Sequence, residues 1–219
     1  RNPNYYARDE VYLDAIRFDF SLNPSTALLK LRRGEVNVLG DYIPPAEYPR
    51  GMADPESRKL VAEEPVIAID YLFMNVHVKP FDDVAVRRAV SMAIDRDRIV
   101  KLLGGTADPL TQILPAGLAG HQEGAAGEFY PYDPQKARQL LAQAGYPDGF
   151  ATTVYSHNVD PWPKVVQSIQ NDLSQIGVRA DVKLLDRATY WTLIGKPGAC
   201  PMGLNDWWMD FPDPSDFII

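Results

Sequence analysis

Four aspartates near the end of the chain have a spacing that could support chemistry. They are Asp206, Asp210, Asp213 and Asp216. Paired carboxylates can exchange protons in acid–base catalysis, and a denser group of them can bind Ca²⁺. The prolines that interrupt this cluster do not fit a calcium loop, and no glutamate-rich segment supplies further ligands. A hydrolase built on these aspartates is therefore an alternative and not the preferred interpretation.

The other reactive residue types form no catalytic or metal-binding motif. His77, His121 and His157 are scattered, and the sequence contains neither His-Glu-x-x-His nor Gly-x-Ser-x-Gly. The glycine-rich stretch 104–132 lacks the Gly-Lys-Ser/Thr of a phosphate-binding loop. Cys200 is the one cysteine, which excludes an internal disulfide, and we interpret it as a small buried hydrophobe. We expect no enzymatic activity, no metal and no cofactor.

The composition is that of a globular protein that does not bind nucleic acid. Of the 219 residues, 46% are hydrophobic and 23% charged, which is typical of globular domains. The formal net charge of −7 and the lack of a basic stripe argue against binding to phosphate backbones. No run approaches the ~20 apolar residues of a membrane-spanning helix.

The strongest structural signal is a strand followed by two helices. Residues 71–75 form a short apolar run that suits a buried strand. Asp83 and Asp95 stand at the N-cap positions of two helices predicted between residues 83 and 103. The first helix has an apolar face with three- and four-residue spacing: Val86, Ala89, Val90, Ala93 and Ile94. A strand that leads into helices in this way indicates an α/β fold.

Before this segment the sequence predicts a strand, a helix and a second strand. Residues 16–20 alternate between apolar and charged side chains, as expected for a strand with one solvated face. Ser25 is placed to cap a helix that ends at Gly34, and residues 36–39 form the second strand, parallel to the first. The prolines in 41–54 favour a loop.

After residue 132 helices and strands alternate. The predicted elements are a helix over 133–144, a strand over 150–155, a helix over 164–176, a strand over 178–184, a short helix capped by Asp186 and a last strand over 200–204.

Six segments carry a resemblance to a known family. They are residues 1–6, 12–16, 27–38, 71–75 with 80–96, 130–150 and 207–214. Taken in this order, they resemble the family 5 extracellular solute-binding proteins of ABC importers, the dipeptide- and oligopeptide-binding group. The last segment, Trp-Trp-Met-Asp-Phe-Pro-Asp-Pro, is similar to that family's Trp-x-x-Asp-Tyr-Pro-Asp-Pro.

The resemblance implies a fold of the type II periplasmic-binding-protein class, in which two lobes close on a ligand. On this mapping residues 1–76 are the C-terminal part of lobe I, and 77–219 are most of lobe II. Asn75, Val76 and His77 are expected at the hinge. Family members are more than twice as long, and the chain has neither an initiating Met nor a signal segment at Arg1. We therefore expect it to be a fragment of a longer protein.

The resemblance also implies a ligand site at the last motif. Asp210 corresponds to the aspartate that binds the ligand's α-ammonium, Trp207 and Trp208 would wall the site, and Met209 would reshape it. Asp206 adds a second negative charge, which favours a short or cationic ligand over a long neutral peptide. The structural alternatives are a turn cap before Pro212 for Asp210 and core packing for the tryptophans. We expect one tryptophan to face inward and one to face the cleft.

The implied function is the substrate-binding component of an ABC importer. Such a protein captures a peptide or peptide-like solute on the periplasmic or extracellular face of the cell membrane and delivers it to permease subunits. Contact with the membrane is expected only through the permease or through a lipid anchor outside this chain. A sugar, a metal complex or a cationic small molecule is the alternative ligand, because members of the same family transport such solutes.

Overall fold

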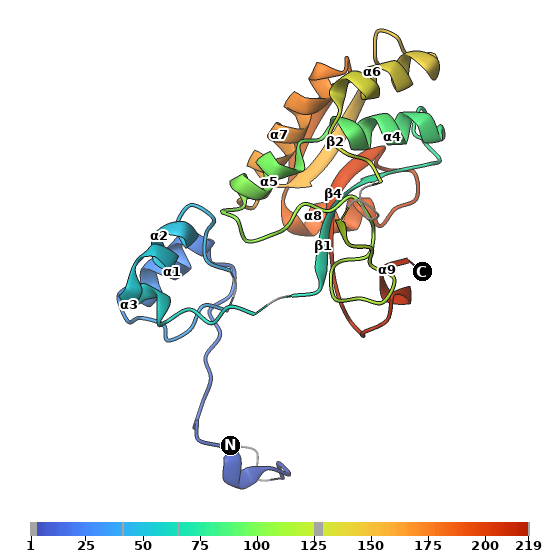
Figure 1. Cartoon of the computed structure of the whole chain (residues 1–219). Coiled ribbons are helices and arrows are strands. Elements are labelled where there is room, and N and C mark those ends of the chain that lie inside the picture. Colours follow the sequence, from blue (N-terminus) through green and yellow to red (C-terminus); the bar gives the residue numbers. More distant parts are fainter. Residues whose placement is uncertain (1–3, 41, 65, 125–128, 219) are drawn as a thin grey trace. The chain divides into compact units, whose positions relative to one another are not determined.

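The computed structural model describes residues 4–40, 42–64, 66–124 and 129–218, and it divides the chain into two compact units (Figure 1). The units are Arg1–Pro44 and Pro45–Ile219. The first three residues of the predicted family motif at 1–6 lie outside the described residues. The division into lobes at residue 76 stays a prediction.

The N-terminal unit has less regular structure than its sequence predicts. Its elements are the 3-10 helix η1 (Arg8–Glu10) and helix α1 (Pro24–Arg32). Asn23, and not Ser25, caps α1, because its side-chain Oδ1 accepts a hydrogen bond from the Ser25 backbone N at 3.0 Å. Gly34 follows the helix with φ +71°, as expected for a residue that ends one.

The two strands predicted in this unit are wrong. Residues 16–20 have no regular secondary structure, although the Phe18 and Phe20 rings stack with centroids 6.1 Å apart. No strand pairs with either segment within the described part of this unit. Ile16 and Phe20 are accordingly 67% and 82% exposed. A strand needs a partner for its backbone groups, which a local pattern cannot supply.

The second unit holds the remaining elements. They are α2 (Tyr48–Ala53), α3 (Pro55–Arg58), β1 (Ala68–Met74), α4 (Val84–Ala93), α5 (Arg96–Leu102), α6 (Pro134–Gln143), β2 (Ala151–His157), α7 (Trp162–Gln175), β3 (Arg179–Leu185), α8 (Arg187–Ile194), β4 (Met202–Trp208) and α9 (Ser215–Ile218). Among the described residues, no helix is both long and apolar enough to cross a membrane.

Local signals located most of these elements correctly. Asp83, Asp95, Asp133 and Asp186 each accept a hydrogen bond from a backbone N–H in the first turn of their helix, at 2.7 to 3.0 Å. The predicted loop over 41–54 is partly wrong, since α2 (Tyr48–Ala53) lies within it. Pro49 lies in the first turn of α2, where its missing N–H removes no helical hydrogen bond.

The four strands form one mixed sheet in the order β1-β4-β2-β3. β2 is parallel to β3 and β4, and β1 pairs antiparallel with β4. Helices α4, α6 and α7 share a buried core with side chains from β2, β3 and β4. Met202 and Leu204 of β4 face that core, so Gly203 between them faces the opposite side of the sheet. Tyr190 of α8 lies against Gly203, and α8 therefore covers this second face.

A buried carboxylate joins α5 to α7. Asp172 on α7 is 1% exposed and forms a short ion pair with the guanidinium of Arg98. Asp172 Oδ2 also accepts the backbone N–H of Asp95, the α5 cap, at 3.1 Å, and Arg98 Nε donates to Ser168 Oγ at 2.9 Å. The network satisfies a charge that would be costly to bury alone.

Replacing Arg98 should therefore cost much more than replacing an exposed arginine. We expect Arg98→Met to lower the free energy of unfolding by about 3 kcal/mol, since it leaves the Asp172 charge buried without a counter-ion. Arg88→Met on the exposed side of α4 is the matched control and should change it by less than about 0.5 kcal/mol. Urea denaturation of both variants measures the difference, and equal effects would show that Asp172 needs no counter-ion.

Candidate functional site

The second half of β4 leaves the sheet as part of a two-stranded ribbon. β4 pairs with β2 at Met202 and Gly203, whereas it pairs with β1 along its whole length, from Met74↔Met202 to Ala68↔Trp208. Beyond residue 203 the ends of β2 and β4 are therefore no longer joined by a ladder of backbone hydrogen bonds. A hollow opens between them.

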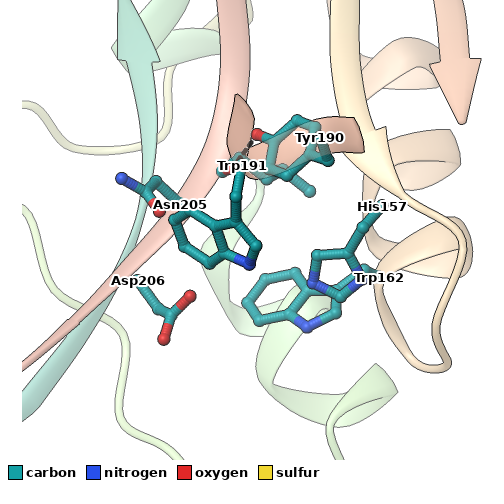
Figure 2. A pocket seen from close by; sticks show the side chains of 7 residues that line it. His157, Trp162, Tyr190, Trp191, Asn205 and Asp206 are labelled. Carbon is teal, nitrogen blue, oxygen red and sulfur yellow. Dashed lines mark hydrogen bonds between the residues drawn. The ribbon is translucent and has the colours of Figure 1, made fainter. Parts of the chain in front are cut away.

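Aromatic side chains line this hollow and fill it closely, so that it has no space for a water-sized probe (Figure 2). Its lining residues are His157, Trp162, Tyr190, Trp191, Leu204, Asn205 and Asp206. They come from the end of β2, the start of α7, helix α8 and the outgoing part of β4. In α/β sheets, ligands bind outside the carboxyl ends of the strands, where helices leave on opposite faces, and the hollow occupies such a position.

Tyr190 fixes helix α8 against β4. Its side chain is fully buried, and its hydroxyl donates a short hydrogen bond to the backbone carbonyl of Leu204. Gly203 makes this approach possible, because a Cβ there would lie 3.0 Å from the Tyr190 hydroxyl and 2.8 Å from the Phe73 ring. Burial raises the pKa of the Tyr190 phenol, which therefore stays protonated as a donor.

His157 is a neutral part of the aromatic wall. It is 7% exposed, its ring meets Trp162 and Tyr190 edge to face, and its Nδ1 accepts the Val159 backbone N–H at 3.3 Å. Burial lowers the pKa of the imidazole, and the positive charge of Arg187 lowers it further, while Asp206 opposes them. These contacts satisfy the imidazole within the fold.

Asp206 is the one carboxylate among the described residues that line the hollow. Its Oδ2 accepts a hydrogen bond from Trp208 Nε1 at 3.1 Å, and within the described residues no basic side chain pairs with it. Directly across the strand pair stands Asp70. Burial raises the pKa of Asp70 to about 6, and the charge of Asp206 contributes to the shift. This edge of the ribbon is therefore rich in negative charge.

Asp210 follows β4 and is exposed. Its backbone N donates to Asp216 Oδ2 at 2.9 Å, and Asp213 Oδ1 accepts the Ser215 backbone N–H at 2.9 Å. The turn-capping role considered for Asp210 thus belongs to Asp213 and Asp216. In the described part of the chain no hydrogen bond to the Asp210 carboxylate is formed, so it is available for a ligand.

The two tryptophans lie on the outgoing ribbon and not in the core. Trp207 and Trp208 are 40% and 61% exposed, so neither is part of the described core, and which of them faces the ligand cleft stays a prediction. The last strand is longer than predicted and contains them. Trp207 Nε1 donates to Asp216 Oδ2 at 3.3 Å, and Met209 continues the ribbon by donating its backbone N–H to Ile67 O at 3.0 Å.

The residues predicted at a hinge follow β1 directly. Asn75 donates its backbone N–H to Pro201 O at 2.8 Å and its side-chain Nδ2 to Cys200 O at 3.2 Å. His77 in turn donates its backbone N–H to Asn75 Oδ1 at 3.0 Å, whereas Val76 is exposed. These bonds hold the end of β1 to the start of β4, and the hinge role stays a prediction.

Sequence reasoning named Asp206 but missed the aromatic wall. The sequence analysis did not identify Trp162, Tyr190 and Trp191 as site residues, because nothing in the segment around each one distinguishes it from an ordinary aromatic residue. Their position just after the carboxyl ends of β2 and β3 was the available signal. Among the described residues, no group of three or more His, Cys, Asp or Glu is placed to hold a metal ion.

Comparison with known proteins gives consistent matches over most of the chain. The family model for bacterial extracellular solute-binding proteins, family 5 Middle, matches residues 1–219. The glutathione-binding protein GsiB of Salmonella typhimurium is 39% identical over 184 residues, which are 83% of this chain and 35% of that protein. GsiB of Escherichia coli is 38% identical over 176 residues, 80% of this chain and 33% of that protein. The chain thus spans about a third of the length of these relatives.

Solved structures show the same fold. The periplasmic binding protein DppA of Helicobacter pylori, in complex with the peptide STSA, aligns with a TM-score of 0.78 and 29% identity, covering 90% of this chain and 37% of that chain. An oligopeptide-binding protein of Borrelia burgdorferi aligns with a TM-score of 0.80 and 25% identity, covering 98% and 42%. A dipeptide-binding protein of Pseudoalteromonas, in complex with Met-Leu, gives 0.76 and 27%, covering 91% and 39%. The predicted fold class, that of type II periplasmic binding proteins, is confirmed.

The opposed carboxylates predict that neutralising Asp70 raises the stability of the fold, by an amount that depends on pH. The folded state raises the pKa of Asp70 from 3.8 to about 6, so it favours the protonated carboxyl. The stability that this protonation provides is full below pH 4 and is lost as pH rises through 6. Asp70→Asn should stabilise the protein at pH 7.5, and the gain should vanish towards pH 4. The gain should be no more than about 1 kcal/mol, because the residue is only partly shielded and solvent screens its exposed part. Thermal melts at the two pH values measure the gain. Asp108→Asn, an exposed control, should give none, and a gain that persists at pH 4 would rule out this charge mechanism.

Proposed function

The chain belongs to the family 5 bacterial extracellular solute-binding proteins, and from this premise we propose that it is part of the substrate-binding component of an ABC importer. The full-length protein captures a peptide or peptide-like solute between two lobes and delivers it to the membrane permease. It works on the periplasmic or extracellular face of the membrane, as a binding protein and not as an enzyme. Asn75, Val76 and His77 are the hinge in this proposal.

The observation that carries the proposal is the Asp210 carboxylate at the end of β4. It is exposed, accepts no hydrogen bond within the described residues and has Trp207, Trp208 and Met209 immediately before it. A carboxylate in such surroundings can form a charge-assisted hydrogen bond to an ammonium group, a bond that contributes roughly 1.5–3 kcal/mol. We assign Asp210 to the α-ammonium of the ligand and the two indoles to the ligand's apolar parts.

The relatives support a small peptide-like ligand. GsiB is named for glutathione, and two structural neighbours hold the tetrapeptide STSA and the dipeptide Met-Leu. Dipeptides, tetrapeptides and glutathione all carry a free amino group and peptide bonds, which an extended binding site can pair with backbone groups. The bulk of Trp208 and Met209 and the charge of Asp206 favour a short or cationic member of this class.

The proposal predicts that Asp210→Asn in the full-length protein weakens peptide binding by about a hundredfold. The amide keeps the shape of the side chain and removes its charge, so the bound ammonium loses its counter-ion, and a hundredfold loss corresponds to about 2.7 kcal/mol. N-acetylated peptide should bind the unaltered protein poorly for the same reason. Calorimetric titration with a set of di- and tripeptides measures both effects.

The melting temperature separates a ligand role for Asp210 from a structural one. Without ligand, Asp210→Asn should melt at the same temperature as the unaltered protein or slightly higher, because its carboxylate supports no bond of the fold. Asp213→Ala is the control: it removes a charge together with a turn cap, so it should lower the melting temperature and leave affinity almost unchanged. A destabilised Asp210→Asn with normal affinity would refute the assignment.

A further inference from the structure

We infer that Asp216 is a positioning residue of the ligand site: its carboxylate holds the Asp210 backbone and the Trp207 indole in the orientation in which they receive the ligand. This inference rests on the proposed function, which assigns Asp210 to the α-ammonium of a peptide. It adds to the site a residue that acts without touching the ligand.

One oxygen of Asp216 joins two parts of the site. Its Oδ2 accepts the Asp210 backbone N–H at 2.9 Å and the Trp207 Nε1–H at 3.3 Å. The first donor belongs to the residue proposed for the ammonium, and the second belongs to one of the two indoles before it. Because an oxygen has two lone pairs to offer, these two donors use both of them. Oδ2 therefore serves to hold the site together and is not left open for a ligand.

The hydrogen bond to Asp210 continues the support that β1 gives to the residues before it. The ladder with β1 runs to Trp208, and Met209 adds a last bond from its backbone N–H to Ile67 O at 3.0 Å. Asp210 is the first residue beyond these bonds, and in the described part of the chain its backbone N–H has Asp216 as its acceptor. The direction in which the Asp210 carboxylate points thus depends on Asp216.

Asp216 can act as an anchor because backbone hydrogen bonds fix its own position. It lies in the short helix α9, where its backbone N–H donates to Asp213 O at 3.1 Å and that of Phe217 donates to Pro214 O at 3.1 Å. Its side chain is partly buried, whereas Asp210 is exposed. A binding group that such a neighbour already orients loses less entropy when the ligand arrives.

The test removes the hydrogen-bond acceptor and the charge of Asp216 separately, in the full-length protein. Asp216→Leu has nearly the same shape but accepts no hydrogen bond, so it should weaken the binding of Ala-Ala, Ala-Ala-Ala or glutathione by about tenfold in calorimetry. Asp216→Asn loses the charge but keeps a carbonyl oxygen that can accept both bonds, so it should recover most of the affinity. An equal loss in the two variants would show that Asp216 acts by its charge and would overturn the inference.

A double-mutant cycle shows whether Asp216 acts through Asp210. If it does, Asp216→Leu should weaken binding much less when Asp210→Asn is already present, because the charge that it orients is gone. The loss should also be much smaller for the N-acetylated form of the same peptide. A loss that is equally large in both backgrounds and for both forms would overturn the inference.

A control variant separates positioning from general damage to the fold. Asp133→Ala removes an aspartate that accepts the Lys136 backbone N–H at 2.8 Å at the start of α6, outside the candidate site. It should lower the melting temperature and leave affinity unchanged. If Asp216→Leu gives this same pattern, Asp216 is structural and the inference fails.

The outcomes also distinguish this inference from the proposed function. Normal affinity in Asp216→Leu together with weak binding in Asp210→Asn would overturn the inference and leave the proposed function standing. A lack of binding of all three probes by the unaltered protein would overturn both. Should Asp216→Leu fail to fold, Asp216→Ala removes the same acceptor with less bulk, and an unchanged affinity there would likewise overturn the inference.

Discussion

The antiparallel pairing of β1 with β4 determines where the candidate site residues of β4 lie. It joins two segments that are distant in the sequence and carries β4 past the last hydrogen bond to β2 at Gly203. Without β1, the residues after 203 would have no partner for their backbone groups, and the ribbon that bears Asp206 and the two tryptophans would have no defined path. The hollow exists because β4 follows β1 away from β2.

The register of this pair is fixed at its inner end. Met202 and Leu204 enter the core, and Gly203 is held on the opposite face between Phe73 and Tyr190, where no larger residue fits without movement. A shift of one residue would turn all these side chains to the other face. It would also move Asp206 away from Asp70 and from the hollow. Core packing at 202–204 therefore sets the chemistry at 206–210, several residues further along the strand.

Sequence reasoning succeeded where the determinants are local. The apolar face of α4 follows from the spacing of its residues, and Asp83, Asp95 and Asp186 cap the helices that directly follow them in the chain. It failed for residues 16–20 and 36–39, because a strand also needs a distant partner, and for α2, because a proline was read as a breaker when it opens a helix. The site divides in the same way. Asp206 to Asp210 form a contiguous motif that can be recognised in one segment, whereas the wall of His157, Trp162, Tyr190 and Trp191 is assembled from three elements and becomes visible only in the fold.

Asp206 and Asp210 differ in how much binding energy an ion pair at each can provide. A pair at an exposed carboxylate contributes about 0–1 kcal/mol, because water screens it and the free charges are well solvated. Asp210 is exposed in the described unit, so a strong pair there requires a further surface that excludes water once the ligand is in place. Asp206 is partly shielded already by the indole of Trp208 and by the aromatic wall. The dependence on closure should therefore be steep for a ligand ammonium paired with Asp210 and shallower for a positive group that approaches Asp206.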